Sequence, residues 1–247
     1  MINIYTEEEI EIMAEGGKIL AKIMKEIVKK VKPGITTEYL NKVANDLIFQ
    51  YGVESSFKGF NNYPAVLCTS LNEEIVHALP SDRILKNGDI LKLDLGIRFK
   101  GYCTDLAVTI PIGKINKNIQ KLISVTKKSL ELAIKQCKPR NHLEDIGWAI
   151  QNHVEKNKFN VIRELVGHGV GKNVHEDPQI LNYGQKGEGE ELKPDMVLAL
   201  EPMVCMGNWQ IEKCEDGFGY RTKDKSLTSH FEHTIAITKK GAKVLTR

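Results

Sequence analysis

The sequence lacks the features that mark membrane, secreted or nucleic-acid-binding proteins. It has no apolar run of the roughly 20 residues that span a bilayer, and its first residues have neither the basic nor the apolar segment of a signal peptide. The net charge of +3 is too small a basic excess to indicate a nucleic-acid binder. We therefore expect a cytoplasmic protein that binds neither a membrane nor a specific nucleic acid.

The cysteines also exclude several kinds of site. They are odd in number, widely spaced and without a Cys-x-x-Cys pair, at Cys68, Cys103, Cys137, Cys205 and Cys214. This pattern argues against a disulfide framework, a zinc knuckle and a redox motif. Free thiols in a reducing compartment are the interpretation that fits best.

The periodicity of apolar residues predicts an α/β protein. With 247 residues, 41% of them hydrophobic and 27% charged, the chain resembles an ordinary globular domain that needs no disulfides to hold its core. The expected helices run from a capping box at Thr6 to the Pro33-Gly34 pair, and then over about 37–51, 117–137 and 142–157. The expected strands lie within 89–112, 196–205 and 231–238. We expect one catalytic domain over residues 1–247.

The two halves of the chain resemble each other. Each half has the order helix, Lys-Pro, helix and then strands in which acidic residues follow apolar ones. The matching segments are Val31–Leu40 with Cys137–Ile146, Leu85–Asp94 with Leu192–Glu201, and Asp105–Ile110 with Glu232–Ile237. These matches predict two related halves, roughly 1–113 and 114–247, within the one domain.

Two pairs of acidic residues stand where the predicted strands should carry core residues. Acids are depleted in strand interiors and are rarely buried without a partner. With a hairpin turn centred on residues 99–100, Asp94 would lie directly opposite Asp105, with Cβ atoms about 5 Å apart. Either that face is solvated or a divalent cation bridges the two carboxylates. The repeat favours the cation, because it brings Glu201 and Glu232 in as a second pair facing the first.

One histidine is a candidate nitrogen ligand for the same site. His168 lies in the glycine-rich segment Gly167–Gly171, where the absence of side chains lets the backbone approach a metal closely. A single histidine is more often structural than a ligand. The glycines and the four acids reverse that expectation and predict two divalent ions held by carboxylates and one imidazole.

Several segments resemble the signature stretches of type I methionine aminopeptidases. They are Asp94–Gly96, Tyr102–Asp105, Gly167–Pro178, Leu200–Met203 and Phe231–Thr234, and the resemblance extends from the first helix to Thr238. It implies the pita-bread (creatinase/aminopeptidase-like) α/β fold, in which two pseudo-symmetric halves enclose a dinuclear metal site. It also implies metal-dependent removal of the N-terminal methionine from nascent proteins and peptides. The chain resembles the short, bacterial-type form, without a zinc-binding extension or a long helical insert.

The resemblance also implies a role for individual residues. The metal ligands would be Asp94, Asp105, His168, Glu201 and Glu232, with Asp105 and Glu232 bridging. His77 and His175 would face the substrate, and Glu201 would carry protons during catalysis. The methionine pocket would be formed by Phe57, Phe60, Tyr63, Cys68 and Phe218. A monovalent cation would lie near Asn72, Glu74 and Thr228.

The metal and the partners are less closely defined. Four carboxylates and one imidazole favour a harder ion such as Mn²⁺ or Fe²⁺, although Co²⁺ or Zn²⁺ would also fit. The family's substrates are nascent chains, so we expect a transient association with the ribosome. We also expect a monomer. The sequence departs from the usual pattern near the site at Phe60, Ala78, Val174, Phe218 and His230.

Two alternatives remain open. A prolidase or aminopeptidase P would share these ligands but usually carries an additional N-terminal domain, whereas this sequence begins directly with the catalytic half. A non-catalytic binding protein with the same fold would be expected to have lost ligands, and all five are present here.

Overall fold

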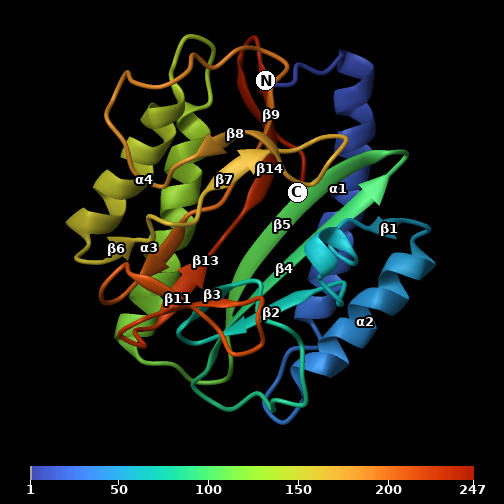
Figure 1. Ribbon diagram of the computed structural model, residues 1–247, viewed down its shortest axis with the longest axis vertical. Helices are drawn as coiled ribbons and strands as arrows, with labels where there is room; N and C mark the ends of the chain where they lie inside the picture. Colours follow the sequence, from blue (N-terminus) through green and yellow to red (C-terminus); the bar gives the residue numbers. More distant parts are fainter. Residues whose placement is uncertain (1) are drawn as a thin grey trace.

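Four α-helices flank the strands in the computed structural model, which describes residues 2–247. They are α1 (Glu7–Val28), α2 (Thr37–Gln50), α3 (Lys117–Gln136) and α4 (Leu143–Lys156). In Figure 1, α1 and α2 lie on one side of the strands and α3 and α4 on the other. The predicted capping box is present, since Thr6 and Glu9 bond each other's backbone N–H groups. However, α1 ends five residues before Pro33, and the N–H groups of Lys30 and Val31 form tighter i→i−3 bonds after it.

The strands form two main antiparallel sheets and two small ones. In the first sheet, β4 (Ile90–Phe99) pairs with β5 (Tyr102–Pro111) on one side and with β1 (Glu54–Ser55) and β2 (Cys68–Leu71) on the other. The second has the order β15-β14-β9-β7-β8, with β7 (Gly167–Gly169), β8 (Glu176–Ile180), β9 (Val197–Leu200), β14 (His233–Thr238) and β15 (Gly241–Val244). One small sheet joins β13 (Thr228–His230), β10 (Met203–Cys205) and β6 (Asn160–Val161). The other joins β11 (Ile211–Lys213), β12 (Tyr220–Thr222) and β3 (Glu74–Val76), and a 3₁₀ helix covers Phe60–Asn62.

The register of the β4–β5 hairpin differs from the prediction. The turn consists of Lys100 and Gly101, both with positive φ, so Asp94 pairs with Ala107 rather than with Asp105. Two positive φ values are what a two-residue hairpin turn of matching twist requires, and glycine supplies one of them at no cost. The shift is by two residues, so Asp94 and Asp105 still lie on one face, as diagonal neighbours.

The expected strand over 196–205 is also divided. β9 ends at Leu200 and β10 starts at Met203 in a different sheet, with Glu201 and Pro202 between them. Proline has no N–H to donate and interrupts a strand ladder. The interruption leaves Glu201 at the end of β9.

Equivalent backbone contacts recur in the two halves. An isolated bridge joins Thr36 to Ile84 in the first half, and another joins His142 to Glu191 in the second. The second partner of each bridge, Ile84 or Glu191, directly precedes a matched leucine of the repeated segments. These leucines are Leu85 and Leu192. The order of helices and strands is also repeated, so the polypeptide follows the same path twice.

Each half has its own main hydrophobic core, and two further clusters combine residues of both halves. Amphipathic α1 and α2 pack on the first main sheet, as α3 and α4 pack on the second. The third cluster includes Met13, Cys103 and Ala236. At the boundary, the N–H of Asp105 donates to Thr234 Oγ1 at 2.8 Å and the N–H of Glu232 donates to the Ala107 carbonyl at 2.9 Å. These bonds fix β5 against β14, and with them the acids that the two strands carry.

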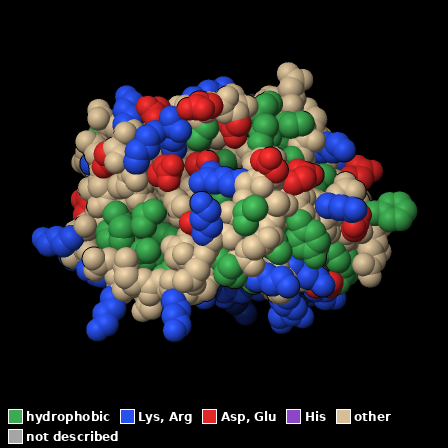
Figure 2. All heavy atoms as spheres, turned by 90° about the horizontal axis from the view of Figure 1, so that it is seen from below, with side chains coloured by type: hydrophobic (Ala, Val, Ile, Leu, Met, Phe, Trp, Pro, Cys, Tyr) green, Lys and Arg blue, Asp and Glu red, His purple; other side chains and the backbone are tan. Residues whose placement is uncertain are grey.

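The face of the molecule seen from below is mixed in charge (Figure 2). Figure 2 shows the molecule from below, with basic and acidic side chains interspersed and smaller hydrophobic patches between them. Among residues 2–247, no helix combines the length and the apolar character that crossing a membrane would require.

Candidate metal centre

All twelve residues that the sequence assigned to metal, catalysis or the methionine pocket line one cavity of about 630 Å³. They come from segments spread along the chain between Phe57 and Glu232. The lining residues are Phe57, Phe60, Asn61, Tyr63, Cys68, His77, Asp94, Asp105, His168, His175, Glu201, Phe218 and Glu232. Asn61 was not predicted, and with φ at 47° it lies in the strained part of the 3₁₀ turn. A lone asparagine in a loop gives no sequence signal for such a position.

The strands explain how the acids reach the cavity. In β4, Leu93 and Leu95 are fully buried against the helices, so the alternation of side chains turns Asp94 to the opposite face. Glu201 and Glu232 lie just beyond β9 and just before β14, two strands paired so that Leu200 faces His233. Continuing that register by one residue brings the two glutamates opposite each other.

The five predicted ligands form two overlapping groups. Asp94, Asp105 and Glu232 offer carboxylate oxygens that all lie within 4.8 Å of one another. His168, Glu201 and Glu232 offer a second such set. Glu232 belongs to both groups, and Asp105 belongs to a third with His168 and His175. The arrangement therefore has room for two neighbouring ions that share carboxylates.

The tautomer of His168 suits a metal ligand. Its Nδ1 lies 2.9 Å from the carbonyl oxygen of Gly169, which can only accept a hydrogen bond, so Nδ1 carries the proton. The lone pair of Nε2 then points toward Glu201, whose Oε1 is 3.5 Å away. Burial, together with His175 and His77, lowers the pKa of His168 to about 3, so the ring is neutral. A neutral imidazole held by a backbone carbonyl is the usual form of a metal-binding histidine.

The electrostatics of the cavity require a positive charge. Burial and the neighbouring carboxylates hold the pKa of Asp94, Glu201 and Glu232 well above the usual range, and burial raises that of Asp105 to about 7. One oxygen of Asp94 and one of Glu232 are buried without a hydrogen-bond partner. No lysine or arginine lines the cavity. Unpaired carboxylate oxygens at this density fit divalent cations, which would satisfy them and neutralise their charge.

The two other predicted histidines border the acids. The ring of His175 lies 4.2 Å from that of His168, and the ring of Phe60 meets His175 edge-on at 5.0 Å between centroids. His77 has a left-handed backbone, with φ at 61°, and burial lowers its pKa to about 4. Both rings can therefore offer a hydrogen bond to a molecule bound at the acids.

The predicted pocket residues form the apolar part of the cavity. Tyr63 and Phe218 pack edge to face at 5.5 Å, and the Tyr63 hydroxyl donates to the Ala78 carbonyl at 3.2 Å. Cys68 pairs with Asp94 across β2 and β4. Burial and the Asp94 carboxylate raise the pKa of the Cys68 thiol, so it stays protonated and is no nucleophile.

The predicted monovalent-cation residues meet at another place. Thr228 Oγ1 lies 3.0 Å from the carbonyl oxygen of Asn72 and 2.7 Å from that of Glu74. A fourth residue, Lys92, reaches the same spot and was not predicted. Burial lowers the pKa of Lys92 to about 7, against the opposing effect of Glu74 and nearby acids.

His230, one of the departures from the family pattern, contacts a predicted ligand directly. It is fully buried, and its Nε2 lies 3.3 Å from Oε2 of Glu201. Burial lowers the pKa of His230 to about 3. This imidazole therefore borders the side of Glu201 opposite His168.

A groove of about 990 Å³ continues outward from the cavity. The two spaces share His77, His168, His175 and Glu201. The far part of the groove is bordered by Glu164, Gln179 and Met203, among others. An apolar pocket, a cluster of acids and an open groove thus follow one another in that order.

Comparisons with known proteins identify the family of the chain. Residues 11–239 match the model of metallopeptidase family M24. The chain is 45% identical to methionine aminopeptidase 1 of Bacillus subtilis over the whole of both chains. It is 39% identical to the methionine aminopeptidase of Escherichia coli K12, covering 99% of this chain and 94% of the relative.

Solved structures give the same result for the fold. The methionine aminopeptidase of Thermotoga maritima superposes over the whole of both chains, with a TM-score of 0.98 and 44% identity. A prolidase from Pyrococcus horikoshii superposes on 99% of this chain with a TM-score of 0.80, but the match covers 63% of the prolidase and only 22% of residues are identical. The prolidase therefore shares the fold alone.

Proposed function

The chain belongs to metallopeptidase family M24, and we propose that it is a methionine aminopeptidase that removes the N-terminal methionine of proteins and peptides. The predicted pita-bread fold and the predicted resemblance are confirmed by the solved and curated methionine aminopeptidases to which it is similar. The observation that carries the proposal is the cavity itself. Two acid groups sharing Glu232 lie between a small apolar pocket and an open groove. That order suits cleavage after the first residue of a chain.

The residues present would hold two divalent ions. Asp94, Asp105 and Glu232 would bind one, and His168 and Glu201 would bind the other together with the shared carboxylates. When bound, the ions supply Lewis-acid polarisation and lower the pKa of water. The carboxylate set favours Mn²⁺ or Fe²⁺, and Co²⁺ or Zn²⁺ would also fit.

The side chains around the acids supply the remaining chemistry. Glu201 keeps 11% of its side chain exposed, and its raised pKa suits a group that accepts a proton from attacking water and passes it to the leaving amine. His175 lies beside the acids and can donate a hydrogen bond to the scissile carbonyl as negative charge develops on its oxygen. His77 borders both cavity and groove, where it can bond the scissile amide.

The apolar pocket accounts for the choice of methionine. Phe57, Tyr63 and Phe218 surround a space in which a flexible thioether can make sulfur–aromatic contacts. Phe60 meets His175 edge to face in the same cavity. The aromatic lining would hold the first side chain, while the groove would accept the residues that follow.

Nascent chains are the natural substrates of such a site, because every one begins with methionine. We accordingly propose action in the cytoplasm, as a monomer in transient contact with the ribosome. The interspersed charges in Figure 2 are compatible with a weak and reversible contact.

A peptide assay tests the proposal. Metal-loaded protein is incubated with Met-Ala-Ser, Leu-Ala-Ser and Ala-Pro-Ser, and the free amino acid is measured. We expect release of methionine about 10- to 200-fold faster than release of leucine, the discrimination that an apolar pocket achieves between similar side chains. Equal rates would refute the methionine preference. Cleavage of Ala-Pro-Ser alone would instead identify a proline-directed peptidase.

A further inference from the structure

Lys92 is the largest fully buried side chain of the described residues. It lies in the middle of β4 with 1% of its surface exposed, two residues before Asp94 and on the same face of the strand. Lysine is almost never buried to this extent without a partner. At the matching position of the second half stands Ala199, so the repeat does not require a long side chain here.

The Lys92 amino group ends at the loop between β2 and β3. Its Nζ donates to the carbonyl oxygen of Asn72 at 2.8 Å. The same oxygen accepts the N–H of Thr228 at 3.0 Å, and the Thr228 hydroxyl also lies 3.0 Å from it. This carbonyl therefore collects donors from β4 and β13 at one point.

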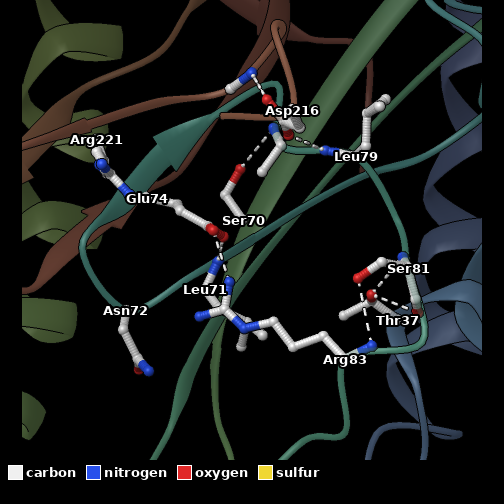
Figure 3. Close-up of polar contacts among 12 residues, drawn as sticks. Thr37, Ser70, Leu71, Asn72, Glu74, Leu79, Ser81, Arg83, Asp216 and Arg221 are labelled. Carbon is white, nitrogen blue, oxygen red and sulfur yellow. Dashed lines mark hydrogen bonds and ion pairs between the residues drawn. The ribbon is translucent and has the colours of Figure 1, made fainter. Parts of the chain in front are cut away.

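The loop itself is held in place by other contacts. Figure 3 shows the Glu74 side chain turned back toward the N–H of Leu71 and the guanidinium of Arg83, with bonds of 2.6 Å to each. The side chain of Asn72 bonds Asp89 and the N–H of Ile90, each at 3.0 Å. The loop carbonyls thus have fixed positions, and the backbone at Asn72 is left-handed, with φ at 53°.

Fixed carbonyl and hydroxyl oxygens of Asn72, Glu74 and Thr228 are the kind of ligands that a Na⁺ or K⁺ ion takes. Here one of those carbonyls already accepts a hydrogen bond from a tethered amino group. A second cation on the same oxygens would meet the Lys92 group at contact distance, where like charges repel. The residues present therefore do not fit a separate monovalent ion.

We propose that the Lys92 ammonium takes the place of a monovalent cation, so that this enzyme works without Na⁺ or K⁺. The amino group ties β4 to the loop between β2 and β3, and Thr228 of β13 bonds the same loop carbonyl. β4 carries Asp94, β3 leads from the loop to His77, and β13 leads from Thr228 toward Glu232. Lys92 is thus a positioning residue, whose amino group is built into the chain rather than taken from solution.

The unmodified protein gives the first test. Its thermal midpoint and its kcat/KM are measured in chlorides of K⁺, Na⁺ and the bulky tetramethylammonium ion, at a constant ionic strength of about 0.1 M. We expect kcat/KM to agree within about twofold in the three salts. The thermal midpoint should agree within about 2 °C. A midpoint or a rate that rises clearly with K⁺ or Na⁺ would overturn the proposal.

Two variants of Lys92 then separate the charge from the packing. Lys92→Ser opens the space, and we expect kcat/KM to fall about 10- to 100-fold in tetramethylammonium chloride and to recover in K⁺ or Na⁺. Lys92→Met fills the space without charge and should not recover in any salt. The matched control is Lys86→Ser at an exposed lysine of the preceding loop, which should behave as the unmodified protein does.

The activity measurements rest on the proposed function, but the thermal midpoints do not. A Lys92→Ser protein whose midpoint is the same in all three salts would contradict the proposal even in the absence of any peptidase activity. If instead the midpoints respond as expected and no peptide is cleaved, only the proposed function fails.

Discussion

The two halves of the molecule agree more closely in backbone than in sequence. At three equivalent turns the first half has a glycine with positive φ, and the second half has another residue in the same left-handed conformation. The pairs are Gly34 with Arg140, Gly52 with Lys158 and Gly88 with Asp195. The turn geometry is thus required by the fold, and the halves meet that requirement with different residues.

The side chains next to the metal centre differ in a way that matters more. In the first half, Lys92 of β4 pairs with Ser70 of β2. In the second half, the matching pair is Ala199 of β9 with His168 of β7. The small Ala199 leaves room beside the imidazole, while the hydroxyl of Ser70 only accepts the N–H of Ala78 at 3.3 Å. Both halves provide acids, but only the second provides a nitrogen ligand.

Removing one shared acid from each half would test the symmetry most severely. We expect Asp105→Asn and Glu232→Gln each to reduce peptide cleavage by more than about 100-fold. Loss of a residue that only hydrogen-bonds a metal ligand already costs up to about 100-fold, and these variants change the ligands themselves. Both should also bind fewer than two equivalents of Mn²⁺ in a calorimetric titration. A variant that kept two ions and full activity would show that the shared-acid arrangement is wrong.

Substituting the matching residues of β7 and β2 should give unequal results. His168→Ala should weaken metal binding by about 100-fold or more, because His168 is the only imidazole among the five predicted ligands. Ser70→Ala should leave metal binding unchanged and cost about 1 kcal/mol in the free energy of unfolding, through one lost hydrogen bond. Metal titrations and urea unfolding measure the two effects. Equal loss of metal binding in both variants would contradict the asymmetry.

The dependence of stability on pH isolates the contribution of one acid. The pKa of Asp105 is about 7 in the metal-free folded protein and about 3.9 in an unfolded chain. Between these values the folded state holds a proton that the unfolded state has lost, so this residue's contribution to stability falls as pH rises. Metal-free Asp105→Asn should therefore gain stability relative to the unmodified protein between about pH 4 and pH 7.

Urea unfolding of both metal-free proteins across that range gives the measurement. The comparison with the variant is needed because the buried imidazoles of His77 and His168, with pKa values lowered to about 4 and about 3, act in the opposite direction. A difference in stability that stayed constant over the range would mean that Asp105 is not protonated as its burial implies.

Exchanging residues at an equivalent turn should have the smallest effect. Gly88→Asp places a side chain in open space, so only the left-handed backbone opposes it, and Asp tolerates that conformation. We expect Gly88→Asp to lower the free energy of unfolding by about 1 kcal/mol. Asp195→Gly should change it by no more than that, because the relief of backbone strain is offset by the greater flexibility of the unfolded chain. Thermal unfolding measures both. A loss above about 3 kcal/mol in either variant would show that the turns are not equivalent.

The sequence predicted the features that depend on strong local patterns. Acids within apolar strands are rare enough to stand out, so Asp94 and Glu201 could be found without a structure. The capping box at Thr6 and the Lys-Pro repeat were equally visible. The hairpin register was wrong by two residues because it depends on which residues take positive φ, and Lys100 gives no such signal before the structure is known.

Lys92 could not be found in the sequence for a different reason. A lysine between two leucines of a strand normally indicates a solvent-facing side chain. Its burial depends on β13 and the loop between β2 and β3 covering the face of β4 that points away from the helices, and these are tertiary contacts. Asn61 and the direct contact of His230 with Glu201 depend in the same way on segments far apart in the chain.

The bonds between β5 and β14 have a consequence for the history of the chain. Asp105 and Thr234, and Ala107 and Glu232, join strands from opposite halves at the point where the acids converge. A single half contains two acids and an exposed edge where the other half now lies. An ancestor of that length would have had to form a homodimer to bring four carboxylates together, and its duplication and fusion would have made that pairing permanent. Cleavage in the connecting segment near residues 113–116 should accordingly yield two fragments that recombine, with divalent ions favouring their association.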